Sequence, residues 1–435
     1  MAEPRINTGG NHSAGPRRTS GQSRKLGRPF VKLWAASTLS GLGDGTTQIA
    51  AALLAASLTR DPVQIAGLMI AHQLPLMLFA LPGGALVDRL DRRRVMIAAC
   101  LVRAAALGLL AAATAAGHAS LPLLYATFFT VGCVGLLFEN ASIALLPFII
   151  DTTQLERANG RLQAATVLSQ QLLAKPLGGV LFAMAAWAPF TLDTLALLAA
   201  AILISALPTR APHRSLSAST SPSHTTFHGA IRQGLGWLAH HRLLRTMSVT
   251  VGLSNLGLGA VFSIAVLIAR ERLGVGPVGY GFLLTAGAVG GVIGGLTAGR
   301  IIALLGTGTT LRTGLIIEML VHLGLALTHS AIVAGGLFAL LSLHLIVFST
   351  IGASLRQQIV PARLLGRVHS AYRLVTNSGM FLGSVLGGVL AHHFGLTAPF
   401  WLGLACTATL TASAWRTLSN RAVQTARAHA PQTPD

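Results

Sequence analysis

The stretch Gly83–Arg94 reads GGALVDRLDRRR and places six charged residues in the seven positions 88–94. Only 10% of the 435 residues are charged and 52% are hydrophobic, whereas a soluble domain carries about a quarter charged residues. Two apolar runs, 63–87 and 95–117, flank the stretch. Each is long enough to cross a bilayer core of about 30 Å. We therefore interpret the stretch as a short polar turn between two membrane-spanning helices.

Apolar segments of similar length recur along the whole chain. A spanning helix needs about 20 predominantly apolar residues. Twelve segments meet this requirement: 30–58, 63–87, 95–117, 120–147, 163–186, 189–207, 247–269, 279–304, 311–328, 331–354, 368–391 and 397–416. The sequence predicts a polytopic helical membrane protein.

The formal net charge of +20 is distributed unevenly. Lys and Arg gather in both terminal segments and in every second connection between spans, while the connections GHASLP and WAP carry none. Arg60, Arg270 and Arg272 are exceptions. Because cytoplasmic loops hold the basic excess in membrane proteins, both termini are expected in the cytoplasm. The charge therefore indicates topology in a lipid bilayer and not nucleic-acid binding.

Composition divides the chain into five parts. A Ser/Thr/Pro-rich segment separates six spans from six, and the stretch IRQGLGWLAHHRLLRTM behind it suits an amphipathic helix on the cytoplasmic membrane face. The parts are a disordered cytoplasmic tail, 1–28; an N-terminal six-helix bundle, 29–207; a cytoplasmic linker with the surface helix, 208–246; a C-terminal six-helix bundle, 247–418; and a cytoplasmic tail, 419–435.

The two halves repeat one another. KPLGGVLFAMAAWAPF (Lys175–Phe190) aligns with GSVLGGVLAHHFGLTAPF (Gly383–Phe400), and GGVL precedes APF by ten residues in the first copy and eleven in the second. A duplicated six-helix unit builds its site between the halves, near the membrane midplane. The expected fold is an all-α membrane protein of twelve transmembrane helices in two six-helix bundles with pseudo-two-fold symmetry. A transporter is the class that this fold favours.

The opening stretch becomes the cytoplasmic turn between the second and third spans. Its charges either latch two bundles together in one conformation or only fix the topology, and the residues leave both interpretations open. GALVDRLDRRR also resembles the loop signature G-x-x-x-D-R-x-G-R-R of the major facilitator superfamily, with Asp91 at a glycine position. The matching residues are Gly84, Asp88, Arg89, Arg92 and Arg93. STLSGLGDGTTQIA and RQQIVPARLLGRVHSAYRL resemble the branch that contains the enterobactin exporter and macrolide efflux proteins.

This resemblance implies alternating access, in which two bundles rock about a central cavity. It also implies an intracellular gate made of the five signature residues together with Arg367, at the start of the eleventh span. The fifth span resembles a helix-packing motif of antiporters at Pro176, Gly178 and Gly179, although Lys175 takes the place of the preceding glycine.

Ionisable residues inside the spans need a reason, because each costs about 2.5–3.5 kcal/mol at a helix centre. Asp44 lies near the middle of the first span and is the preferred proton carrier or substrate contact. Lys175 lies about as deep in the fifth span, where it could pair with Asp44 or Glu139 or attract an anionic substrate. Glu139, in the fourth span, is a candidate cavity residue. For each, a purely structural hydrogen bond is the alternative.

Glu318 and His322 are four residues apart and share one helix face, so they form a candidate proton relay. Arg103 is expected to extend to the cytoplasmic surface, and Asp193 and His344 are expected to be structural. The histidine pairs lack further ligands at metal spacing, so no metal site is expected. The chain has no G-x-x-x-x-G-K-S/T pattern, so no nucleotide or other cofactor is expected either.

These observations predict a secondary transporter that exports a small amphipathic molecule, either a siderophore or a drug-like compound, by proton-coupled alternating access. The expected partners are that substrate, protons and the bilayer, and the chain is expected to work as a monomer in a bacterial inner membrane. A lysophospholipid flippase of the same fold is an alternative. An intramembrane enzyme is disfavoured because no G-x-S-x-G pattern is present. A non-transporting receptor would not need the gate residues.

Overall fold

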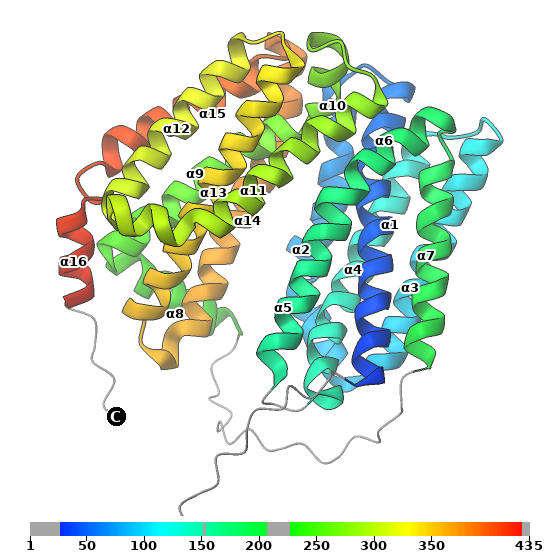
Figure 1. The fold of residues 1–435 in the computed structure, drawn as a ribbon, viewed down its shortest axis with the longest axis horizontal. Helices are drawn as coiled ribbons and strands as arrows, with labels where there is room; N and C mark the ends of the chain where they lie inside the picture. Colours follow the sequence, from blue (N-terminus) through cyan, green and yellow to red (C-terminus); the bar gives the residue numbers. More distant parts are fainter. Residues whose placement is uncertain (1–26, 151–153, 207–226, 429–435) are drawn as a thin grey trace, which may run out of the picture.

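The computed structural model describes residues 27–150, 154–206 and 227–428, which form two groups of helices (Figure 1). The expected disordered tail up to residue 26 and the first part of the linker, 207–226, lie outside the described residues. The helices of the N-terminal half are α1 Arg28–Leu58, α2 Pro62–Arg89, α3 Arg92–Ala115, α4 Leu121–Ile149, α5 Leu155–Thr166, the π-helical segment η2 Val167–Leu173, α6 Ala174–Met184 and α7 Ala188–Ser205.

The C-terminal half begins with a shorter helix and then repeats the pattern. Its helices are α8 Phe227–His240, α9 Arg242–Ser263, α10 Ala265–Leu267, the π-helical segment η3 Ile268–Arg272, α11 Pro277–Leu305, α12 Thr307–Leu327, α13 Ala331–Ile359, α14 Ala362–Phe394, α15 Ala398–Ala414 and α16 Asn420–Ala428. Since α5, η2 and α6 run on as one helix, as do α9, α10 and η3, each half contains six long helical segments.

Ten helices in the described part of the chain are long and apolar enough to cross a membrane. The other two of the expected twelve are α1 and α15. α15 has 17 residues, slightly fewer than a straight crossing needs. α1 contains the polar stretch SGLGDGTTQ, but it packs along α7 and α6 and also contacts α2 and α4. The hydroxyls of Ser40, Thr46 and Thr47 are buried against these helices, as a polar spanning helix requires, whereas Gln48 is exposed.

The two bundles meet mainly along two helix pairs, α2 with α14 and α6 with α11. Glycines bring these backbones together: Gly179 lies against Pro277, Gly281 lies against the carbonyl of Lys175, and Gly388 lies against Pro62. Small residues of this kind drive close packing of helices within a membrane.

Two polar contacts between the bundles lie at this same end, and a third, of 3.4 Å from Gln73 Nε2 of α2 to Ser384 Oγ of α14, lies further along the helices. Asp61, directly before α2, is 3.1 Å from His392 Nδ1 near the end of α14. The guanidinium of Arg270 donates a 2.7 Å hydrogen bond to the carbonyl of Ala56 at the end of α1. The bundles are therefore held together at this end of the molecule by both close backbone packing and polar contacts.

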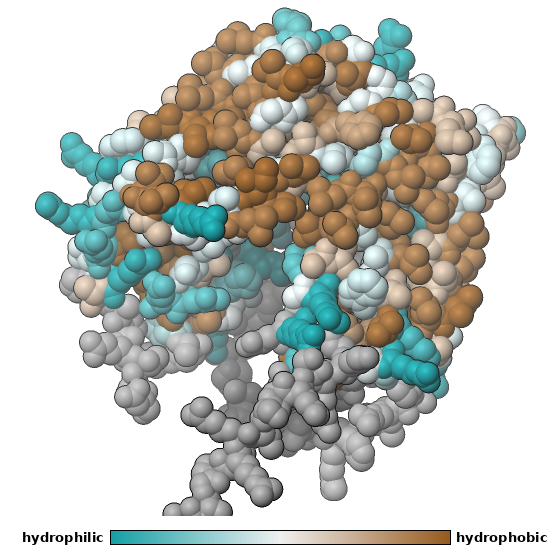
Figure 2. Space-filling view, in the orientation of Figure 1, coloured by the Kyte–Doolittle hydropathy of each residue, from teal (hydrophilic) through white to brown (hydrophobic). Residues whose placement is uncertain are grey.

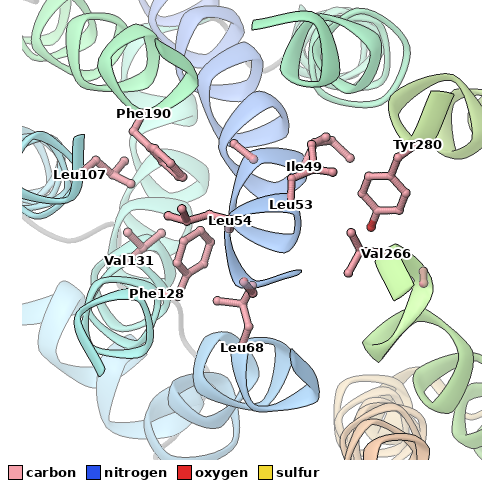
Figure 3. Packing of buried hydrophobic residues seen from close by; sticks show 14 of the residues in the cluster. Ile49, Leu53, Leu54, Leu68, Leu107, Phe128, Val131, Phe190, Val266 and Tyr280 are labelled. Carbon is pink, nitrogen blue, oxygen red and sulfur yellow. The ribbon is translucent and has the colours of Figure 1, made fainter. Parts of the chain in front are cut away.

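Two clusters of buried apolar side chains form the core, and they are distributed unequally between the bundles. One cluster joins both bundles: Ile49 and Leu53 of α1 lie close to Val266 and Tyr280 of the C-terminal half (Figure 3). A second cluster, which includes Leu244 of α9, belongs to the C-terminal half alone. The ribbons diverge toward the end where α5, α8 and α16 lie, and the surface is hollowed there between the bundles (Figures 1 and 2). The molecule is therefore closed at one end and open at the other.

The charged turn of the opening stretch lies at the open end. Asp91 is the N-cap of α3, because its side chain accepts hydrogen bonds from the amides of Arg93, at 2.9 Å, and Arg94, at 3.3 Å. This explains why aspartate is acceptable where the loop signature has glycine. The side chain of Arg93 donates to the carbonyls of Ile204 and Ser205 and so satisfies the end of α7.

The helix expected in the linker forms as α8, and it packs against α14. Gly234 of α8 lies against the backbone of Arg367, and Leu238 is buried. The segment expected to be a C-terminal tail contains α16, which packs on α12 and buries Val423. Both segments therefore extend the C-terminal bundle at the open end.

Candidate functional site

Two buried polar centres lie inside the bundles, one in each half. The first involves Asp44, which α1 carries between Gly43 and Gly45. The Asp44 carboxylate forms an ion pair with the guanidinium of Arg103 on α3. Its other oxygen is 3.5 Å from the Ser40 hydroxyl, one turn earlier on α1. The Arg103 side chain is only 4% exposed and that of Asp44 is 29% exposed, so the pair is reached from the Asp44 side.

The sequence predicts that Arg103 extends to the cytoplasmic surface, but in the structure it does not. The prediction was wrong because it rested on the position of Arg103 near the cytoplasmic end of its span and did not include an oppositely charged partner on α1. An arginine is costly in a membrane without an opposite charge, and Asp44 supplies that charge.

A second carboxyl, that of Asp193 on α7, belongs to the same centre. Asp193 is 1% exposed and interacts electrostatically with Arg103. Gly43 makes room for it, since a Cβ at this position would overlap the Asp193 carboxyl. The Thr47 hydroxyl is near, yet within the described residues neither Asp193 oxygen has a partner with hydrogen-bond geometry.

Apolar side chains surround this centre along the helices. Phe190 is one turn before Asp193 on α7, and Leu107 is one turn after Arg103 on α3; both are fully buried. Figure 3 shows both side chains packed toward Leu54 of α1. Two acidic groups and one basic group therefore share a site that is open to water only on the Asp44 side, and its charges interact more strongly than they would at the surface.

The second centre lies in the C-terminal half around Glu318 of α12, which is 1% exposed. Its Oε2 accepts hydrogen bonds from Ser254 Oγ of α9, at 3.1 Å, and from His344 Nε2 of α13, at 3.2 Å. Its Oε1 has no partner among the described residues. His344 is therefore not isolated, because its Nε2 is within hydrogen-bond distance of the Glu318 carboxyl.

His322 shares the helix face of Glu318, as expected, but it bonds to the backbone. Its Nδ1 is 2.9 Å from the carbonyl of Glu318, and a carbonyl only accepts, so Nδ1 carries the hydrogen. The ring lies against Gly403 of α15, where a Cβ would collide with it. The carboxylate of Glu318 thus connects to His344 instead of His322.

Lys175 and Glu139 are outside both centres. Lys175 is half-buried on α6 and makes no ion pair with the residues that the structure describes, so Asp44 pairs with Arg103 and not with Lys175. It is the second residue after the π-helical segment η2, a distortion that is frequent at functional sites. Glu139 is exposed on α4, and the described residues provide no ion pair for it either.

The predicted gate residues are only partly described. The side chains of Gly84, Asp88 and Arg89 lie outside the described residues. Arg367 donates a hydrogen bond to Gln233 of α8, so it contacts its own half of the molecule. Across the described residues no group of three or more His, Cys, Asp or Glu side chains could hold a metal ion.

The helix-packing motif lies between three helices. Gly178 faces α1, where a Cβ would press on the backbone of Thr46, and Gly179 faces α11 across the bundle interface. The motif thus supports a contact within the N-terminal bundle and another between the bundles.

Comparison with protein families gives one match that covers nearly the whole chain. The family described as transmembrane secretion effector matches residues 26–433. An uncharacterized MFS-type transporter, YfiS of Bacillus subtilis (strain 168), is 26% identical over 390 residues, which are 85% of this chain and 88% of the relative. Macrolide efflux protein A of Streptococcus pyogenes is 24% identical over 385 residues, 86% of this chain and 92% of the relative.

Solved transporters share the fold at low sequence identity. A bacterial homologue of the iron transporter ferroportin, in an inward-facing state, has a TM-score of 0.72 with 17% identity and covers 91% of this chain and 99% of its own. A point mutant of the nucleoside transporter NupG has a TM-score of 0.72 with 10% identity over 90% of this chain and 99% of its own. These likenesses confirm the expected fold of twelve helices in two bundles.

Proposed function

Because the chain belongs to the transmembrane secretion effector family of the major facilitator superfamily, whose members are transporters and not enzymes, we propose that it exports a small amphipathic molecule by proton-coupled alternating access. The substrate classes proposed are siderophores and drug-like compounds. Efflux is the activity named for one relative, the macrolide efflux protein.

The closed and open ends support alternating access. The bundles are joined at one end by α2–α14 and α6–α11 and separate toward the other. The positive-inside rule assigns the basic open end to the cytoplasm, and with it both termini. A cavity open to the cytoplasm is the state in which an exporter of a bacterial inner membrane takes up its substrate.

The single observation that carries proton coupling is the ion pair of Asp44 with buried Arg103. A carboxylate that is paired in one state and partly exposed can exchange its partner for a proton. One proton that crosses a potential of 100 mV supplies about 2.3 kcal/mol. Transport that is driven in this way needs no nucleotide as its energy source. Glu318 and His322 are proposed as further titratable groups of the cycle, and Glu139 as a residue of the substrate cavity.

Lys175 supports a substrate that carries a carboxylate. Arg103 is neutralised by Asp44, whereas the half-buried Lys175, at the contact of α6 with α11, makes no ion pair with the described residues and so stays available to a substrate. An anionic siderophore would meet this charge between the bundles. Lipophilic cations would be repelled by it.

The gate is proposed to act in the opposite state of the cycle. When the cytoplasmic ends approach, Arg367 would leave Gln233 and join the signature cluster of Gly84, Asp88, Arg89, Arg92 and Arg93. Its present contact with α8 supports this, because an arginine that bonds to a neutral amide is easily released to a carboxylate.

The experiment is collapse of a pH gradient in energised inverted vesicles on addition of siderophores, macrolides or lipophilic cations. The wild type should respond to one class, and Asp44→Asn should not. Glu271→Gln, which removes an exposed carboxyl near the closed end, is the control and should respond like the wild type. An equal response in Asp44→Asn would exclude Asp44 from coupling, and no response to any compound would contradict the export proposal.

A paired substitution tests the substrate class. Lys175→Gln should raise the KM for carboxylate-bearing siderophores and leave that for macrolides unchanged, while Lys175→Arg should retain the siderophore response. If Lys175→Gln changes both substrates equally, then Lys175 has a structural role.

A further inference from the structure

Asp193 is a deeply buried acid whose carboxyl has a charged neighbour, Arg103, but no hydrogen bond among the described residues. It is 1% exposed, and both carboxyl oxygens lack a hydrogen-bond partner among the described residues. A buried carboxylate without hydrogen bonds or a dedicated cation costs several kcal/mol, and such a group avoids that cost by binding a proton.

The charges around Asp193 leave it one cation short. α7 packs against α1, α3 and α6. α1 supplies Asp44 and the Thr47 hydroxyl, and α3 supplies Arg103 and the Cys100 thiol. Lys175 of α6 has no contact that joins it to Asp193 in the described part of the chain. Two carboxyls thus share one guanidinium, and that guanidinium is paired with Asp44.

The fold itself does not require a carboxyl at this position. The repeated APF motif aligns residues 188–190 with residues 398–400. In this register Asp193 of α7 corresponds to Gly403 of α15, so the second bundle builds the equivalent helix without an acid. Gly43 leaves space for the Asp193 carboxyl. The N-terminal half therefore accommodates an acidic group that its repeat lacks.

We infer that Asp193 is a proton-binding residue of the transport cycle and that it forms, with Asp44 and Arg103, a centre that holds one exchangeable proton. In the structure, open at its basic end, the proton is on Asp193 and Asp44 is ionised. This inference rests on the proposed proton-coupled function and adds to it a second carboxyl and a mobile counter-ion.

The exchange conserves both protons and charge. A proton that reaches Asp44, the more exposed carboxyl, forms an O–H bond there and releases Arg103. The guanidinium then pairs with Asp193, whose O–H bond breaks and whose proton leaves. The net charge of the centre is zero before and after, so no uncompensated charge is buried. The shift of Arg103 from α1 toward α7 changes the contacts among α1, α3 and α7.

The test is the infrared spectrum of the purified full chain in lipid nanodiscs at neutral pH. A protonated carboxyl has a C=O stretching band that a carboxylate lacks. Asp193→Asn should lose part of this band, and Asp44→Asn should lose the same part because Arg103 then ionises Asp193. Arg103→Gln should strengthen it. Asn has the shape of a protonated Asp, so the two Asp→Asn variants should keep the fold.

Glu318→Gln is the matched control for the other buried carboxyl and should leave the part assigned to Asp193 unchanged. A band of wild-type intensity in Asp193→Asn would overturn the inference, because Asp193 would then be ionised. Loss of that part in Glu318→Gln would also overturn it, since the proton would belong to the other bundle.

Flux measurements separate this inference from the proposed function. Asp193→Asn should lose accumulation driven by a pH gradient and keep substrate exchange between compartments of equal pH. A wild type whose flux ignores the pH gradient, with the infrared result as expected, would overturn proton coupling and leave the proton site standing. Gradient-driven accumulation at the wild-type rate in Asp193→Asn would overturn the role of Asp193 in the cycle.

Discussion

Substitution of Arg103 should destabilise the protein far more than substitution of either Asp44 or Asp193, the two acids with which it interacts. The guanidinium is 4% exposed and is shared between Asp44 and Asp193. Arg103→Gln leaves the buried carboxyl of Asp193 and the partly exposed carboxyl of Asp44 without a cation. Removal of one partner from a buried pair costs about 3–5 kcal/mol. For a unit of about 150–250 residues, this lowers the melting temperature by about 6–20 °C.

Either carboxyl alone should be dispensable for stability. In Asp44→Asn or Asp193→Asn, the remaining carboxyl still neutralises the guanidinium, so the loss is that of a single hydrogen bond, about 1 kcal/mol. The triple variant, with all three groups replaced by amides, should recover much of the stability that Arg103→Gln loses. Replacement of a complete buried ion cluster by neutral groups is often nearly neutral.

The assay is thermal unfolding of the purified protein in one detergent, followed by intrinsic tryptophan fluorescence. Arg300→Gln provides the matched control, because Arg300 is exposed on α11 and no ion pair involves it within the described residues. If Arg103→Gln unfolds within a few degrees of Asp44→Asn, then the guanidinium is not the shared counter-ion of two carboxyls. The reasoning about the centre would then be refuted.

Three further predictions concern the close packing and the hydrogen bonds of buried residues. Gly43→Ala places a Cβ on the carboxyl of its neighbour on α7 and should cost about 1–3 kcal/mol in thermal unfolding, whereas Gly135→Ala, which meets open space on α4, should cost nothing measurable. Ser254→Ala removes a donor from the buried carboxylate of α12 and should cost about 1–3 kcal/mol; Ser248→Ala, whose hydroxyl bonds to its own helix, should cost less. Gly388→Leu should prevent the close approach of α14 to α2, so spin labels at the closed end should report larger separations than in the wild type.

The architecture was predictable because its signals are redundant. Long apolar segments, basic connections in every second position and the repeated GGVL and APF motifs all indicate the same two-bundle arrangement. A single error in one boundary does not change that result. The helical caps were less visible. Asp91 was counted as a departure from a glycine pattern, although an aspartate before RRR is also a common N-cap.

The polar centres were predicted only in part, because each is built from helices far apart in the sequence. Asp44 and Glu318 were visible as acids within apolar segments. Their partners were not, since Arg103 is 59 positions from Asp44 and His344 is 26 positions from Glu318. Periodicity describes one helix at a time and does not say which helix faces which. The repeat between the two halves could have helped to find Asp193, because it aligns this acid with Gly403 and so marks it as a group that the second half lacks.

The two centres occupy equivalent places but have opposite central charges. α12 begins at residue 307 and α3 at residue 92, and in that register Glu318 of the second half corresponds to Arg103 of the first. The basic centre is surrounded by acids, and the acidic centre is surrounded by donors. Ser254 and His344 both hydrogen-bond to Oε2 of Glu318, so only Oε1, which has no partner among the described residues, is open to a proton. Asp193 receives none among the described residues. Proton exchange should therefore be easier at Asp193, while the hydrogen bonds of Glu318, the further titratable group, also hold α9, α12 and α13 together.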